Sequence, residues 1–219
     1  MKYPNDLISK VKQRSRGMKL EGINEGAGPK SPALMIVGEA PGRKEIQSHI
    51  PFHGSSGKEL MKSLALIGLK RSDVISLVLL EAVLMPLKKV FSKRENKEVI
   101  KYPNRKPTKK EIFAHAPFLD YEIKHVKPKL IVAVGGTAIK RLLGPGHSIS
   151  QEHGKVVKNT SILQLNDKED DYVWSKQKYT VFFQYHPAAV FYNRKLANDI
   201  KEDWLSIKPY LHKEAKKIK

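Results

Sequence analysis

Short apolar runs alternate along the chain with segments of helical period. Four of these runs predict strands, and the first of them, which is too short for a helix and is bounded by Pro32 and Gly38, matches a buried strand of a parallel sheet. The predicted strands are Ala33–Val37, Val74–Val83, Leu130–Val134 and Tyr179–Phe183. The longer segments predict amphipathic helices. The predicted helices are Asp6–Gln13, Lys58–Leu69, Glu111–His125, Thr137–Leu143 and Ala197–Tyr210. We also expect a hairpin over Val156–Leu165, interrupted by the acidic patch Asp167–Asp171.

Strands that alternate with helices predict a parallel sheet with helices on both faces. The fold class expected is α/β, with three α/β/α layers around a central, mostly parallel, four-stranded sheet. Residues 1–219 are expected to form one domain, with a basic helix and loop over 1–30 and a lysine-rich insertion over 88–110. For this insertion, a loop that contacts DNA or a partner and a plain solvated loop both remain open. Ligands bind at the carboxyl ends of the strands in such sheets, so the loops after Val37, Val134 and Phe183 are the candidate site.

Charge and composition narrow the class of partner. The formal net charge is +19 and the sequence pI is about 9.9, which favours a polyanionic partner. A ribosome or a membrane surface would favour the same charge as DNA does. The chain contains no cysteine, which excludes disulfides, thiolate catalysis and a cysteine-bound iron–sulfur cluster. No apolar run approaches the roughly 20 residues that span a bilayer. The first six residues lack the apolar stretch of a secretory signal, so we expect a cytoplasmic protein, or one in another DNA-containing compartment.

Two motifs stand at the ends of predicted strands. The sequence GEAPG over Gly38–Gly42 follows the first strand, and Pro51–Gly54 and Gly57 come shortly after it. The sequence HPAAV over His186–Val190 follows the last strand, and a glycine turn at 135–138 and the stretch 148–155 lie between. From about residue 33 to about residue 204, this order resembles the uracil-DNA glycosylase superfamily and its thermophile-type branch. The resemblance implies a uracil-DNA glycosylase-like fold and a DNA glycosylase activity.

The resemblance also implies roles for individual residues. Cleavage of a base–sugar bond leaves negative charge on the base and cation-like character on the sugar. His186 would donate to the pyrimidine O2, and Glu39 would handle water or contact the base. Phe52 would stack on the flipped base. Each has a plainer alternative: a histidine that caps a strand end, a carboxylate at a helix start, and a phenylalanine that fills the core.

The remaining implied positions contact the base or the DNA. Those expected at the base are Gly38, Ala40 and Val78. Those expected at the DNA backbone or stack are Pro51, Gly54, Gly57, Gly136, Thr137, Val190, Arg194 and Lys195. Val190 takes the place of the wedge that fills the vacated stack, and Phe191 and Tyr192 are possible assistants. The partner expected is DNA, for a monomer that binds no membrane, metal or other cofactor.

Two positions depart from the family pattern. The branch usually has four cysteines for an iron–sulfur cluster, whereas this chain has Ala82 and Ala114 at two of the aligned positions. Val78 stands where an asparagine normally binds the edge of uracil. This loss of a bidentate contact leaves open excision of uracil, or of a modified pyrimidine in repair or in defence against phage with modified DNA. It also leaves open a catalytically inactive nucleic-acid-binding module, such as a ribosome-associated factor.

Overall fold

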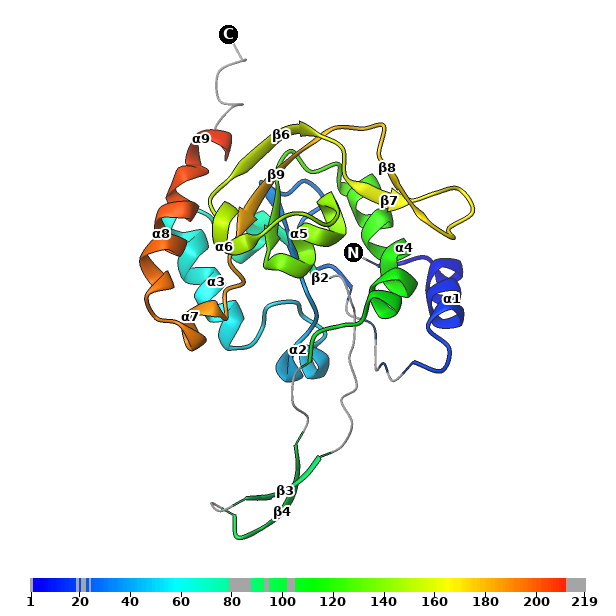
Figure 1. Ribbon diagram of the computed structural model, residues 1–219, viewed down its shortest axis with the longest axis vertical. Coiled ribbons are helices and arrows are strands. Elements are labelled where there is room, and N and C mark those ends of the chain that lie inside the picture. The colour runs from blue at the N-terminus through cyan, green and yellow to red at the C-terminus, as the bar shows by residue number, and fades with distance from the viewer. Residues whose placement is uncertain are drawn as a thin grey trace.

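A computed structural model describes residues 2–18, 20, 23, 25–78, 88–92, 95–101 and 105–211 of the chain. Its central sheet has five strands in the order β2-β1-β5-β9-β6 (Figure 1). The strands are β1 (Leu34–Gly38), β2 (Val74–Val78), β5 (Ile131–Val134), β6 (Val156–Thr160) and β9 (Tyr179–Gln184). The first four in this order run parallel, as the sequence predicted, and β6 pairs antiparallel with β9 as a fifth strand at the edge. The predicted α/β class is confirmed.

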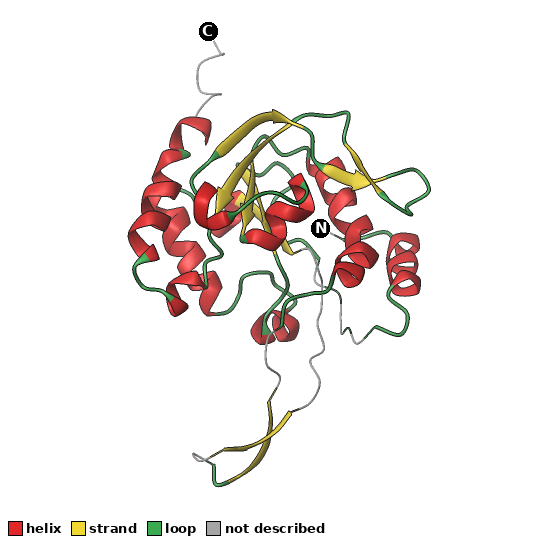
Figure 2. Ribbon diagram, in the orientation of Figure 1, coloured by secondary structure: helices red, strands yellow, loops and turns green. Residues whose placement is uncertain are grey.

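Helices cover both faces of this sheet, and every position of the inner strands β1 and β5 is buried (Figure 2). One face packs on α4 (Lys109–Val126) and α5 (Gly136–Leu143). The other packs on α3 (Ser55–Leu66) and α8 (Leu196–Ser206). Successive strand residues alternate between the two faces, so that Phe183 belongs to the first core and Phe182 to the second. Three layers result.

A smaller core joins α1 (Asn5–Arg14) to α4. Tyr3 stacks on Phe118 with ring centroids 4.2 Å apart, and its hydroxyl donates a 2.6 Å hydrogen bond to buried Glu122. Pro117 lies inside α4. Proline has no N–H, so the carbonyl of Phe113, four residues earlier, loses its helical partner. The Arg14 guanidinium donates to that carbonyl at 3.0 Å and thereby replaces the lost bond.

Two small hairpins lie outside the central sheet. Within 88–110, β3 (Lys88–Ser92) pairs with β4 (Lys97–Lys101), and Figure 1 shows this hairpin projecting away from the layers. The predicted hairpin over Val156–Leu165 is wrong. Its first half is β6 of the main sheet, and β7 (Leu163–Leu165) pairs instead with β8 (Tyr172–Trp174). Hydrogen bonds from Asn166 to the acidic patch close the β7–β8 turn.

The remaining elements are short. They are α2 (Arg43–Ser48), η1 (Arg71–Asp73), α6 (Ile149–Glu152), α7 (Ala189–Tyr192) and α9 (Lys208–Leu211). The predicted strand over Val74–Val83 is observed as far as Val78. Its last five positions, which include Ala82, lie outside the described residues. Among the helices that the structure describes, none has the length and apolarity to cross a bilayer. Neighbouring β1, β5 and β9 run parallel, so their carboxyl ends, and the loops that follow them, lie at one edge of the sheet.

Candidate active site

The structure brings together the two motif loops that lie furthest apart in the sequence. The rings of Phe52 and His186 have centroids 6.2 Å apart and planes inclined by 35°. Gly135, in the loop after β5, packs against the same histidine, since a Cβ there would lie 3.3 Å from the His186 Cβ. The loops after β1, β5 and β9 therefore converge, as their positions in the sequence predicted.

Phe52 lies against the end of β1 and is only 4% exposed. A Cβ on Gly38 would lie 2.6 Å from the ring atom Cζ of Phe52, so only glycine leaves room for the ring at this distance. Val78 pairs with Gly38 in the sheet register and lies beside it at the end of β2. The two predicted base-binding positions Gly38 and Val78 are thus neighbours of the phenylalanine ring. Ala40, the third of these positions, is partly exposed in the loop after β1.

His186 is held as a neutral donor. Burial lowers its pKa, and the nearby carboxylates Glu39 and Glu45 oppose this effect less strongly. Its Nδ1 accepts a 3.2 Å hydrogen bond from the backbone N–H of Ala188. A neutral imidazole that accepts at Nδ1 carries its proton at Nε2. The motif therefore supplies both the histidine and the amide that fixes its tautomer.

Glu39 is held from the loop after β5. The Thr137 hydroxyl, near the start of α5, donates a short hydrogen bond to the Glu39 carboxylate. Gly135 precedes α5 with a φ of 90°, a left-handed conformation that favours glycine. Thr137, predicted as a DNA contact, thus positions the predicted catalytic carboxylate, and Gly136 is the first residue of α5.

A buried carboxylate supports the loop that carries Phe52. Glu45 on α2 is 5% exposed, and its Oε1 accepts a 2.9 Å hydrogen bond from the N–H of Gly54. Its burial and this hydrogen bond place Glu45 as a support of the loop. Gly54 and Gly57 were expected to approach phosphate. The Gly54 amide is already bound, and Gly57 makes room for the Phe52 carbonyl, from which a Cβ would lie only 1.7 Å. Their contact with phosphate stays a prediction.

Comparison with known proteins assigns the family. The family model described as the uracil DNA glycosylase superfamily matches residues 25–208, which include every element of the site. The chain belongs to the uracil-DNA glycosylase superfamily. It is 32% identical over 187 residues to a type-4 uracil-DNA glycosylase of Sulfurisphaera tokodaii, covering 84% of this chain and 72% of the relative. A type-4 uracil-DNA glycosylase of Saccharolobus solfataricus is 30% identical over 214 residues, covering 94% and 86%.

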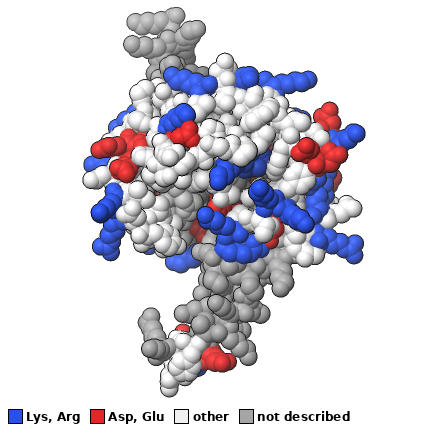
Figure 3. Space-filling model, viewed as in Figure 1, with Lys and Arg blue, Asp and Glu red and all other residues white. Residues whose placement is uncertain are grey.

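The predicted DNA-contact positions near the last motif of this superfamily member lie on α7 and in the turn before α8. Val190 is partly buried and packs against the second core, whereas Arg194 and Lys195 are exposed. Phe191 and Tyr192 are 54% and 92% exposed. Figure 3 shows lysine and arginine side chains spread over the visible face of the molecule, so charge alone does not mark one binding surface.

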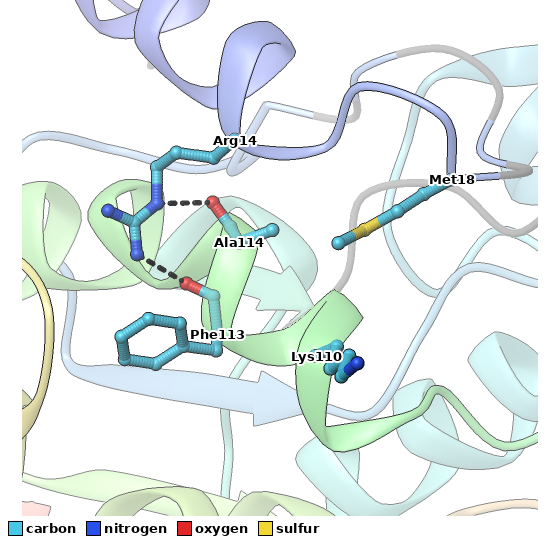
Figure 4. Close-up of a pocket in the computed structure, with 5 residues that line it drawn as sticks. All are labelled: Arg14, Met18, Lys110, Phe113 and Ala114. Atoms are coloured by element: carbon cyan, nitrogen blue, oxygen red, sulfur yellow. Dashed lines mark hydrogen bonds between the residues drawn. The ribbon is translucent and has the colours of Figure 1, made fainter.

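The family's iron–sulfur cluster does not fit the residues present. The chain has no cysteine, and Ala114 on α4 is 3% exposed, with a carbonyl that accepts a 3.2 Å hydrogen bond from Arg14. Ala114 lines a hollow of about 260 Å³, together with Arg14, Met18, Lys110 and Phe113 (Figure 4). None of these side chains is a thiolate, imidazole or carboxylate. This hollow lies at the contact of α1 with α4, away from the motif loops. Among the described residues, no three histidines and carboxylates are grouped so as to hold a metal ion.

Sequence reasoning did not identify Arg71, whose guanidinium lies on the loop that carries Phe52. The residue sits in the short helix η1, outside every motif and every periodic segment. No sequence signal marked it, because its contacts are made across 19 and 20 residues of chain.

Proposed function

We propose that this protein is a DNA glycosylase that hydrolyses the N-glycosidic bond of a pyrimidine turned out of DNA, with uracil as the first substrate to test. The observation that carries the proposal is the proximity of the rings of Phe52 and His186, whose centroids lie 6.2 Å apart although the residues come from two separate motifs. Membership of the superfamily and the names of the type-4 relatives support uracil as the base.

Different residues of the site stabilise the negative charge that develops on the base and the cation-like charge that develops on the sugar. Phe52 is the stacking surface for the extruded base. The Nε2–H of neutral His186 donates to the pyrimidine O2 as the base takes up the electron pair of the breaking bond. Glu39, held by Thr137, faces the sugar, where a carboxylate stabilises cation-like charge and orients the attacking water. The hydroxyl of that water ends on the sugar C1′, its proton passes to the Glu39 carboxylate, and the pyrimidine leaves with the electron pair of the broken bond.

The outer positions are proposed to hold the DNA. Exposed Arg194 and Lys195 contact phosphates beside the lesion, and the α7 turn that contains Val190 fills the vacated stack. Much of the affinity then comes from cations on the surface, so binding weakens steeply as salt concentration rises.

A modified pyrimidine is the second candidate substrate, and Val78 is the observation that favours it. Val78 is 8% exposed beside Gly38 and presents an apolar group where relatives use an amide. An asparagine that binds the uracil edge contributes roughly 1–3 kcal/mol of discrimination by analogy with base recognition in DNA. Without it, the pocket selects uracil less strictly, and an oxidised, hydroxymethylated or glycosylated pyrimidine of phage DNA becomes a candidate.

One panel tests both substrates. Labelled single-stranded and duplex oligonucleotides that carry uracil, 5-hydroxymethyluracil, 5-hydroxymethylcytosine or a glucosylated pyrimidine are incubated with the protein and then with alkali. We expect cleavage at the uracil site, and its loss with His186→Ala. Cleavage only at a modified base would assign the second candidate.

The alternative of an inactive nucleic-acid-binding module predicts a different result. The protein would then shift every oligonucleotide in a gel without creating an alkali-labile site in any, and His186→Ala would leave that binding unchanged. That outcome would overturn the glycosylase proposal.

A further inference from the structure

The backbone of Phe52 is held in an unfavourable conformation. Its φ is 54°, in the left-handed region that residues other than glycine and asparagine rarely adopt. The residue is nonetheless placed so that its ring lies against Gly38 and His186. A conformation of this kind persists only where the surroundings hold it.

Arg71 is the side chain that holds it. Its Nη1 donates a 3.0 Å hydrogen bond to the carbonyl of Pro51, and its Nη2 donates a short one to the carbonyl of Phe52. The Phe52 carbonyl also lies against Gly57, where a Cβ would meet the oxygen at 1.7 Å. The carbonyl is therefore both bound by a guanidinium and packed against a glycine, which restricts the peptide that follows Phe52.

Glu45 binds the same loop through a backbone N–H, whereas Arg71 binds backbone carbonyls. Its carboxylate accepts from the Gly54 N–H, two residues after Phe52. Burial lowers the pKa of Arg71, and Glu45 opposes that effect, so the two charges are close enough to interact. The loop Pro51–Gly54 thus has its carbonyls bound by a cation and its amide bound by an anion.

We propose that Arg71 is a positioning residue for base excision, which acts through Phe52. It keeps the Phe52 ring beside Gly38 and His186, where an extruded base would stack on it, and it does not itself touch the base or the DNA. The inference rests on the proposed glycosylase function. It goes beyond that function by adding a residue to the site that no motif contains.

A double-mutant cycle tests this dependence. Single-turnover base release and DNA dissociation constants are measured for the wild type, Arg71→Ala, Phe52→Ala and the double variant. Base–aromatic stacking predicts a loss of roughly 10- to 100-fold for Phe52→Ala, and about 10-fold for Arg71→Ala. The double variant is expected to match Phe52→Ala, because Arg71 has nothing left to position. The rate at saturating DNA should fall, and the dissociation constant should stay within about twofold of the wild type.

Arg14→Ala is the matched control, since Arg14 also donates to two consecutive carbonyls, those of Phe113 and Ala114, away from the motif loops. It should lower the melting temperature and leave the rate of base release unchanged. Arg71→Lys keeps the charge but loses the two-pronged geometry, and an intermediate rate is expected. If Arg71→Ala does not fold, the cycle is run with Arg71→Lys.

Multiplicative losses in the double variant, or a wild-type rate in Arg71→Ala, would overturn the inference. A second measurement does not depend on activity. In a crystal structure of Arg71→Ala, or of Arg71→Lys, we expect Phe52 to leave positive φ and its ring to move from His186. An unmoved ring would contradict the inference even if the wild type releases no base, a result that by itself refutes only the proposed function.

Discussion

Arg71 and Arg14 make the same kind of contact in two regions of the molecule. Each guanidinium donates to two consecutive backbone carbonyls: Arg71 to those of Pro51 and Phe52, and Arg14 to those of Phe113 and Ala114. Each also satisfies carbonyls at an irregular point of the chain. For Arg71 that point is the left-handed residue Phe52, and for Arg14 it is the helical carbonyl that Pro117 leaves without a partner.

The two irregularities have different consequences. At the α1–α4 contact, the hydrogen bonds of Arg14 connect α1 to α4 beside a small apolar core. This is the region of Ala114, where the chain has no cysteine to bind an iron–sulfur cluster. At the motif loops, the turn that Arg71 binds carries the Phe52 ring, which lies close to His186. A similar contact therefore supports stability in one region and geometry in the other. Substitutions in the two regions should separate activity from stability.

The largest effect is expected at His186. His186→Ala removes the donor to the developing charge on the base, and loss of such a donor lowers kcat roughly 10²- to 10³-fold. The side-chain hydrogen bond that this variant loses is the one accepted from the Ala188 N–H, so the free energy of unfolding should fall by about 1 kcal/mol. Single-turnover rates on a uracil oligonucleotide and urea unfolding measure both. A large stability loss with full activity would contradict the division between the regions.

The next effect belongs to the α1–α4 region and depends on pH. Burial lowers the pKa of His115 from 6.5 to about 4, and Glu111 opposes this less strongly. Between these values the unfolded chain binds a proton that the folded chain does not, so acid favours unfolding. The contribution of His115 to the free energy of unfolding should fall by up to about 3 kcal/mol as pH drops from 6.5 to 4 and stay constant below that.

Urea unfolding at several pH values checks this prediction. His115→Gln should flatten the decline over that range. The control is His125→Gln, at an exposed histidine of the same helix, which should leave the decline in place. An unchanged slope in His115→Gln would show that other groups cause the acid sensitivity.

The four parallel strands and the meeting of the motif loops could be predicted from the sequence, whereas the antiparallel edge strand β6 and the contacts that hold the loops could not. Buried parallel strands are continuous apolar runs, such as Leu130–Val134, and parallel order places the loops after them at one edge. Arg71 left no pattern, because its hydrogen bonds depend on where η1 lies in the folded chain. The pairing of β7 with β8 was missed for a similar reason, since an acidic stretch was taken as an interruption when it forms the turn between them.

A smaller effect is expected from Arg14→Ala, at about 2 kcal/mol of unfolding free energy, because hydrogen bonds from a charged donor contribute roughly 1.5–3 kcal/mol. Pro117→Ala restores an N–H that can bond the Phe113 carbonyl within the helix. The loss caused by Arg14→Ala should therefore shrink in the Pro117→Ala background. Chemical denaturation of the four proteins measures this coupling, and equal losses in both backgrounds would refute the proposed repair of α4.

The smallest effect distinguishes two side chains of α7. Val190 packs against the core, while Tyr192 is 92% exposed and free to enter a base stack. Filling a vacated stack matters only where a stack exists. We therefore expect Tyr192→Ala to slow uracil release from duplex DNA about fivefold, or roughly 1 kcal/mol, and to leave release from single strands unchanged. Val190→Ala is the companion variant, and the ratio of duplex to single-strand rates is the measurement. If only Val190→Ala lowers that ratio, the wedge is Val190, as its place in the motif predicted, and Tyr192 lies outside the duplex.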